Sequence, residues 1–271
     1  MITGRNLLGQ WEDREILAKE LSNEFTVVIS YPEEMEWKKS EKYEMIVSRC
    51  TWQYPAKAEE QEKVQRTIAE FRHYAIENRL KVYNPLIGKG DMQGKGYLLK
   101  LYESGYPVIP SVSDWRRLNE LGESTEFIVK PINGLGSGGI ARMKRDELVD
   151  AKPNGIIQPL MSFTSEVSFY FVDEKYIYGL SFTPNRDTAR TSPQEFIPSQ
   201  KEIEFAQRFI KWNAMGPGIQ RIDAIKKTDG TLLLLELEDA AQYLNLVNVS
   251  PETRTRFLAA FEKSVAEMYA K

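Results

Sequence analysis

The chain has 271 residues, of which 42% are hydrophobic, and its 36 basic and 39 acidic side chains leave a net charge of -3. This length can bury a substantial core in one large domain or two to three lobes, and the charge balance shows no basic excess for a nucleic-acid partner. One cysteine excludes an internal disulfide, and one histidine disfavours a histidine-rich metal site or a Ser-His-Asp triad. Without a membrane-length apolar run or a signal pattern, the chain is predicted to have no membrane partner and to lie in the reduced cytoplasm.

The first 85 residues are predicted to form a small α/β lobe with a parallel sheet. Helices are expected over residues 11–22 and 58–78, and strands over 25–30, 45–49 and 81–83. Residues 1–6 make a poor first strand. His73 falls on the polar side of the second helix and is predicted to be a surface residue.

A central lobe is predicted for residues 86–154. Its loop at 88–94 leads into a helix over 95–104, followed by a strand at 108–109, a helix at 114–121 and a strand at 126–131. Residues 133–139 are the most glycine-dense stretch, and a strand at 140–143 and a helix at 144–150 follow. The last lobe, 155–271, is predicted to contain strands at 155–159, 166–172 and 176–182, a final hairpin, and helices at 201–212 and 251–269.

The strongest short-range signal is an Asp-Gly pair at residues 229–230, which stands between two apolar-rich runs. Such a pair is typical of a two-residue turn between antiparallel strands. That turn would place Asp223 opposite Glu236, and by the same register Arg221 opposite Glu238. Directly opposed residues and residues two apart share a face, so these four charged side chains are predicted to form one patch.

Three carboxylates against one guanidinium would repel one another on a bare sheet. A bound cation would remove this repulsion, and clustered carboxylate oxygens suit Mg²⁺, which proteins usually share with substrate phosphates. The alternative is an ordinary solvated face of a charged hairpin.

The glycine-rich stretch matches the spacing of a dinucleotide-binding fingerprint, with glycines at 134, 136 and 139. That fingerprint should open a helix directly, whereas a short apolar run follows here, so we predict a strand-loop-strand unit. The motifs of protein kinases and of the Walker A loop are absent. Small residues expose backbone N–H groups, and Lys130 at the strand end can add a positive charge for a phosphate. The alternative is a flexible hairpin tip.

Taken in order, these segments resemble the ATP-grasp superfamily from about residue 83 onward. Lys95 and Lys130 look like its two nucleotide-binding lysines. Glu166 resembles its ribose-binding carboxylate. The resemblance further implies nucleotide contacts from the glycine loop and from a hinge whose backbone holds adenine: Gly136, Ser137, Gly138, Gln158, Pro159, Leu160 and Met161.

The same resemblance implies that Arg221 is catalytic. It also implies that Asp223, Glu236 and Glu238 hold Mg²⁺. Many family members have asparagine where Glu238 stands, so this chain departs from the family pattern by a third carboxylate at the metal. Two arginines of the loop at 183–198, Arg186 and Arg190, are expected to contact the γ-phosphate or the acid substrate, or to be plain loop residues.

The chain also resembles glutathione-synthetase-like and cycloserine-biosynthesis ligases, in which residues 48–54 would match an Arg-x-x-Trp-x-Tyr segment. The resemblance implies an α/β protein with the ATP-grasp fold, in which the central and C-terminal lobes hold the nucleotide. It implies an ADP-forming carboxylate–amine ligase that works through an acylphosphate. ATP and Mg²⁺, or Mn²⁺ in its place, would be the cofactors. A small-molecule carboxylate and an amine would be the partners, and a homodimer is compatible with the sequence.

Three alternatives remain open at this point. An ATP-grasp kinase would phosphorylate a small molecule without ligation. A non-catalytic nucleotide-binding protein could use the same fold, because fold does not guarantee activity. A metal-dependent nuclease uses Asp followed by Glu-x-Lys, but Glu238 stands in the lysine position and the chain is mildly acidic.

Overall fold

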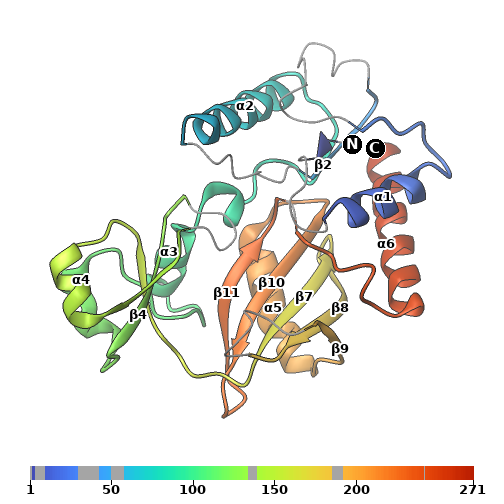
Figure 1. Cartoon of the computed structure of the whole chain (residues 1–271). Coiled ribbons are helices and arrows are strands. Elements are labelled where there is room, and N and C mark those ends of the chain that lie inside the picture. Colours follow the sequence, from blue (N-terminus) through green and yellow to red (C-terminus); the bar gives the residue numbers. More distant parts are fainter. Residues whose placement is uncertain are drawn as a thin grey trace.

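The computed structural model describes residues 2–3, 10–29, 43–49, 58–133, 139–184, 192–240 and 242–271, with only the backbone described for 2–3, 10–12, 58–65 and 68. Its strands form three sheets, which follow one another along the chain (Figure 1). The N- and C-terminal ends lie close together beside the helix that ends the chain.

The N-terminal segment builds a three-stranded parallel sheet in the order β1 (Ile2–Thr3), β2 (Ile46–Arg49) and β3 (Val82–Tyr83), with helices α1 (Gln10–Leu21) and α2 (Ala58–Glu77). This confirms the predicted parallel sheet. The opening residues, interpreted as a poor first strand, contribute only the two-residue strand β1. The strand predicted at 25–30 is wrong for its described part, because residues 25–29 form no strand. His73 is an exposed helix residue, as predicted, and lies 3.0 Å from Glu77 one turn later.

The middle of the chain forms a three-stranded antiparallel sheet in the order β5 (Ala141–Lys144), β4 (Glu126–Lys130) and β6 (Ile156–Pro159). Helix α3 (Tyr97–Glu103), helix α4 (Arg145–Ala151) and the 3-10 helices η3 (Asp91–Gln93) and η4 (Trp115–Leu121) accompany it. Because β4 and β5 are antiparallel neighbours, the strand-loop-strand prediction is confirmed. The helix predicted at 114–121 is a 3-10 helix, capped by the Asp114 carboxylate on the Arg116 N–H.

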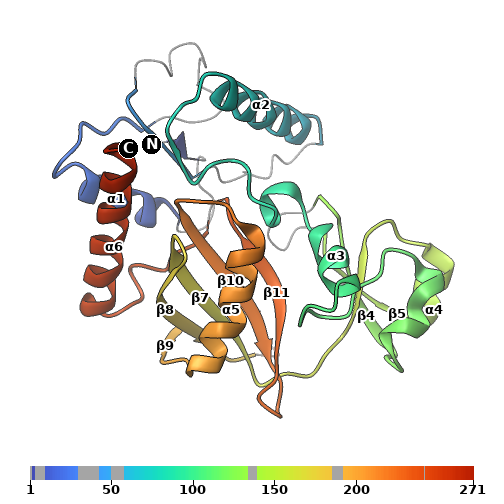
Figure 2. The same ribbon diagram turned by 180° about the vertical axis from the view of Figure 1, so that it is seen from behind.

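The C-terminal part forms a five-stranded antiparallel sheet in the order β11, β10, β7, β8, β9. Its strands are β7 (Ser165–Val172), β8 (Lys175–Phe182), β9 (Gln194–Phe196), β10 (Ile219–Lys226) and β11 (Leu232–Glu238), and its helices are α5 (Gln200–Asn213) and α6 (Pro251–Tyr269). Short strand β9 was not predicted. Figures 1 and 2 show α5 against one face of this sheet and α6 beside the β8 end.

Alternating side chains of β7 enter two separate cores. Phe169 and Phe171 pack with Phe209 of α5, whereas Tyr170 and Val172 belong to the core of α1 and α6. This alternation is what a strand covered on both faces requires. The face that carries Tyr170 also carries the charged residues of neighbouring β10.

The hairpin between β10 and β11 has the predicted register at the charged residues but a different turn. Lys227 N–H donates to Thr231 O at 2.9 Å, and Gly230 N–H donates to Lys227 O at 2.9 Å. The loop therefore has three residues, with Gly230 in the left-handed region at φ 81°. The predicted two-residue turn is wrong.

A β-bulge compensates for that longer loop. Asp223 pairs with Glu236, but the next residue, Ala224, pairs with Leu234, so that Leu235 is the extra residue of β11. The extra turn residue shifts the register by one residue, and the bulge shifts it back by one. The charged residues consequently meet where the two-residue turn would have placed them.

Candidate active site

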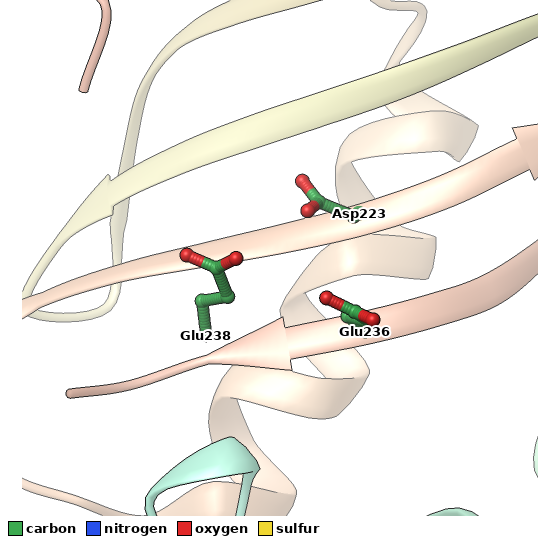
Figure 3. A group of neighbouring side chains, drawn as sticks. All are labelled: Asp223, Glu236 and Glu238. Carbon is green, nitrogen blue, oxygen red and sulfur yellow. The ribbon is translucent and has the colours of Figure 1, made fainter. Parts of the chain in front are cut away.

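Three carboxylates converge on one face of the β10–β11 hairpin (Figure 3). Asp223 projects from β10, and Glu236 and Glu238 project from β11 on the same side of the sheet, away from helix α5. One ligand oxygen from each carboxylate lies within 4.8 Å of the other two. This donor set and spacing fit a hard divalent cation such as Mg²⁺, which prefers carboxylate oxygens.

Arg221 ties two of these carboxylates together. Its guanidinium donates to both oxygens of Asp223 at 2.9 and 2.7 Å and to Glu238 Oε1 at 2.6 Å. A further N–H donates to the Tyr243 carbonyl at 2.9 Å. Burial opposes the charge of Arg221, but Asp223 and Glu238 outweigh burial and raise its pKa. The sequence prediction that these residues form one patch is confirmed by this register and these contacts.

The cluster carries more negative charge than Arg221 alone can neutralise. Burial, reinforced by Asp223 and Glu236, raises the pKa of Glu238 to about 8 in spite of Arg221. Ser168 of β7 donates to Asp223 Oδ1 at 2.6 Å and fixes its rotamer from the opposite strand. The carboxylate oxygens of the site are therefore oriented by neighbouring side chains, and burial disfavours the charged form of Glu238.

Lys95 lies in the turn just before α3 and is 1% exposed. Its ammonium lies 2.6 Å from Asp91 Oδ2 and 2.7 Å from Glu236 Oε1. Burial disfavours the ammonium, but the two carboxylates outweigh burial and raise the pKa of Lys95. Lys95 thus contacts the carboxylate cluster directly, through Glu236.

Lys130 ends β4 and is 4% exposed. It forms no ion pair with any side chain in the described part of the chain. Burial lowers its pKa, although Glu236 and Glu166 act in the opposite sense. A buried cation of this kind gains strongly from an anion that enters the site.

The candidate hinge is the outer strand of the three-stranded sheet and the residues after it. The Leu160 N–H donates to the Glu126 carbonyl at 2.9 Å, whereas on the opposite edge of β6 Ile157 exchanges two backbone hydrogen bonds with Val112. Gln158 is buried, and its side-chain amide donates to Ser111 Oγ at 2.9 Å.

Glu166 is half-buried and lies on β7, two residues before Ser168. Its side chain therefore projects from the same face of the strand as that of Ser168. Its charge acts on Lys130. Several predicted site residues, Gly136, Ser137, Gly138, Arg186 and Arg190, lie outside the described residues.

The N-terminal sheet also contacts the segment that follows the hairpin. Asp13 of α1 accepts the Leu244 and Leu246 N–H groups at 2.7 and 3.0 Å. Arg49, the described arginine of the Arg-x-x-Trp-x-Tyr segment, is buried and donates to the Gln242 carbonyl. Residues 50–57, which complete that segment, lie outside the described residues.

Sequence reasoning missed Asp91, Tyr97 and Ser168. Asp91 and Lys95 stand four residues apart but share no helix, because η3 ends at Gln93 and α3 begins at Tyr97, so helical spacing gave no signal for this pair. Ser168 had none, because its contact with Asp223 depends on the pairing of β7 with β10, which are 55 residues apart at this point.

Within the described residues, no helix is both long enough and apolar enough to cross a bilayer. No protein-family model matches the sequence, and no curated protein matches it in a sequence search.

Solved structures do match, over nearly the whole chain. D-cycloserine synthetase DcsG matches with a TM-score of 0.74 and 21% identity over 99% of this chain and 98% of that one. The ATP-grasp ligase PsnB, complexed with a precursor variant, Mg and ADP, gives 0.65 and 17% over 96% and 97%. D-alanine–D-alanine ligase from Bacillus anthracis, complexed with ATP, gives 0.62 and 12% over 99% and 97%. The chain therefore has the ATP-grasp fold that its sequence resemblance predicted.

Proposed function

We propose that this protein is an ATP- and Mg²⁺-dependent ligase that joins a carboxylate to an amine and releases ADP and phosphate. The observation that carries this proposal is the cluster of Asp223, Glu236 and Glu238 on a hairpin of an ATP-grasp fold. Solved relatives of the fold are ligases complexed with ATP or with Mg and ADP.

In this proposal the three carboxylates hold Mg²⁺, which supplies charge neutralisation for the phosphates when bound. Asp223 is held in place by Arg221 and Ser168, and Glu236 by Lys95. Phosphoryl transfer depends on positioning and on electrostatic stabilisation more than on covalent help from the protein. A site with oriented carboxylates and no histidine among its described residues suits that chemistry.

Lys130 is the residue that we propose for direct contact with a phosphate. It is buried, close to Glu236 and without an ion-pair partner in the described part of the chain. Arg186, Arg190 and the loop with Gly136, Ser137 and Gly138 remain proposals for the phosphate tail and the acid substrate.

For the nucleoside, the backbone geometry narrows the candidate contacts. The Leu160 N–H is already used by the Glu126 carbonyl, and Pro159 has no N–H. We propose that adenine bonds to the Pro159 carbonyl and the Met161 N–H, which by strand alternation would face away from β4, on the side where Ile157 pairs with Val112. Glu166 is the proposed acceptor for the ribose hydroxyls.

The proposed reaction has two steps. An oxygen of the substrate carboxylate attacks the γ-phosphorus, and the bond to the β-phosphate oxygen breaks to release ADP. The amine nitrogen then attacks the acyl carbon, the C–O bond to phosphate breaks, and the amine loses a proton. Arg221 is positioned at the cluster to stabilise negative charge that develops on the transferred group and on the tetrahedral intermediate.

Two tests separate this function from its competitors. The first measures ADP release over a panel of carboxylates, with and without amines, and identifies products by mass. The panel includes free amino acids and peptides with acidic side chains, because one structural relative is complexed with a precursor. A ligase needs the amine for a coupled product, a small-molecule kinase yields a stable phosphorylated product without it, and a non-catalytic protein releases no ADP.

The second test follows oxygen-18 from a labelled substrate carboxylate. An acylphosphate route transfers one labelled oxygen to inorganic phosphate. Coupled product with unlabelled phosphate would rule out the acylphosphate step while leaving the ligase assignment standing.

A further inference from the structure

A short segment that leads into α3 contacts the end of strand β11. Two of the three clustered carboxylates, Glu236 and Glu238, lie at that end. The segment covers residues 88–97 and contains η3 and the first residue of α3. It contacts three consecutive parts of β11 and its continuation: the Glu236 side chain, the Leu237 backbone and the Asp239 side chain.

The first contact is a chain of three buried charges. Lys95 stands between Asp91 and Glu236, at 2.6 Å from Asp91 Oδ2 and 2.7 Å from Glu236 Oε1. The side chains of Lys95 and Asp91 are only 1% and 8% exposed, so water hardly screens their attraction. Glu236 Oε1 is thereby occupied, which turns the carboxylate into one orientation.

The second contact runs through Tyr97. Its hydroxyl donates to Asp91 Oδ1 at 2.7 Å and accepts the Leu237 N–H at 2.7 Å. Both oxygens of Asp91 are therefore engaged, one by Lys95 and one by Tyr97. The same carboxylate thus connects with the side chain of Glu236 and with the backbone of the residue that follows it.

The third contact anchors the loop that carries Asp91. Asp239 is fully buried, and its two oxygens accept the Gly90 and Met92 N–H groups at 2.8 Å each. Gly90 lies so close to β11 that an added Cβ would be 2.6 Å from the Leu237 carbonyl oxygen. The backbone on both sides of Asp91 is therefore fixed relative to the hairpin.

Lys95 and Lys130 differ in their ion-pair partners. Both are buried, but Lys95 already has two carboxylate partners, whereas Lys130 has no ion pair within the described residues. A lysine held in this way is suited to orienting a carboxylate.

We propose that Asp91 is a positioning residue for Glu236, acting through Lys95, in the metal-dependent reaction proposed above. Asp91 holds the ammonium from behind, and Lys95 holds one oxygen of Glu236, so that the other oxygen is presented to the cation. Without the Asp91 charge, Lys95 keeps only Glu236 as a carboxylate partner, and the net charge next to the metal becomes more positive. Both the lost orientation and the added positive charge weaken binding of a divalent cation.

The test measures the affinity of the nucleotide-free, full-length protein for Mn²⁺ alone by calorimetric titration. Asp91→Asn should weaken Mn²⁺ binding by about tenfold, the lower end of what removal of an orienting partner costs a metal site. Glu236→Gln should weaken it further. In the Glu236→Gln background, Asp91→Asn should have a clearly smaller effect, because only the change in charge remains once the carboxylate that Asp91 orients is gone.

Lys226→Met is the matched control. It removes another lysine–glutamate ion pair, at 2.9 Å between Lys226 at the turn end of β10 and Glu202 of α5, which includes none of the clustered carboxylates. Mn²⁺ affinity in this variant should equal that of the wild type. A general softening of the hairpin would lower Mn²⁺ affinity in both variants and would overturn the specific role of Asp91.

The outcomes separate the two proposals. A wild-type protein that binds no Mn²⁺ overturns the proposed function and this inference with it. Normal Mn²⁺ affinity in Asp91→Asn, or the same loss with and without Glu236, overturns the inference alone. Should Asp91→Asn fail to fold, Tyr97→Phe removes one of the two hydrogen bonds to Asp91, and unchanged Mn²⁺ affinity in that folded variant contradicts the inference.

Discussion

The five-stranded sheet contributes carboxylates to the candidate site, and the three-stranded sheet contributes a lysine. The carboxylates already have ion-pair partners, whereas the lysine has none among the described residues. On the larger sheet, Asp223, Glu236 and Glu238 are each held by a cation, either Arg221 or Lys95. On the smaller sheet, Lys130 is buried without an ion pair among the described residues. The difference suggests that the carboxylate cluster is assembled before any ligand binds, whereas the lysine gains its partner only when an anion arrives.

The largest expected effect on ATP turnover comes from removing one of the clustered carboxylates. Asp223→Asn or Glu236→Gln should abolish ATP turnover, because even groups that merely orient a metal ligand are worth about 10–100-fold. Turnover is measured as ADP release. Glu174→Gln, at an exposed turn, is the control with the same loss of charge. Unchanged turnover in both variants would remove the basis of the metal assignment.

Arg221 tests whether the cluster is held together by its own cation. Arg221→Met leaves Asp223 and Glu238 without their buried partner and should destabilise the fold by roughly 3–5 kcal/mol. Chemical denaturation measures that loss. Because Mg²⁺ can replace the missing positive charge, it should raise the melting temperature of this variant more than that of the wild type. An equal rise in both would mean that the cation binds elsewhere.

Lys130 tests the other side of the comparison. Lys130→Met should weaken nucleotide binding by about tenfold or more, since a charge-assisted hydrogen bond contributes about 1.5–3 kcal/mol. The fold should be as stable as the wild type or more so, because a buried ammonium without an ion pair is removed. Lys152→Met, an exposed lysine beyond α4, is the control. Lost stability together with normal nucleotide affinity would assign Lys130 a structural role instead.

The smallest effect concerns the turn of the β10–β11 hairpin. This turn lies at the opposite end of the strands from the carboxylates. Gly230→Ala forces a side chain into the left-handed region at φ 81° and should cost about 1 kcal/mol of stability. ATP turnover should not change, because the bulge at Leu235 separates the turn from the register at Asp223. A large fall in turnover would show that the turn controls the site geometry.

Helix α6 and the β10–β11 hairpin show what the sequence could and could not predict. Local signals placed α6 well, since Ser250 caps it and Pro251 is its first residue. Local signals also placed the charged residues opposite one another, but through a two-residue turn that is not there. The extra turn residue and the bulge cancel, and no local pattern in four consecutive leucines reveals a bulge.

The unpredicted parts of the site depend on contacts between distant segments. Ser168 reaches Asp223 across a strand pairing, and Tyr97 reaches Leu237 over 140 residues of sequence. The missing strand at 25–29 has the same explanation, because an apolar run forms a strand only where a neighbouring strand accepts it. Charge type and local spacing were predictable, whereas the partners that orient each charge were not.

The most direct test of the central claim is a crystal structure with Mn²⁺ and a non-hydrolysable ATP analogue, using the anomalous signal of manganese. The account predicts a peak among Asp223, Glu236 and Glu238, with the γ-phosphate of the analogue beside Lys130. A nucleotide bound with no manganese at these three carboxylates would contradict it.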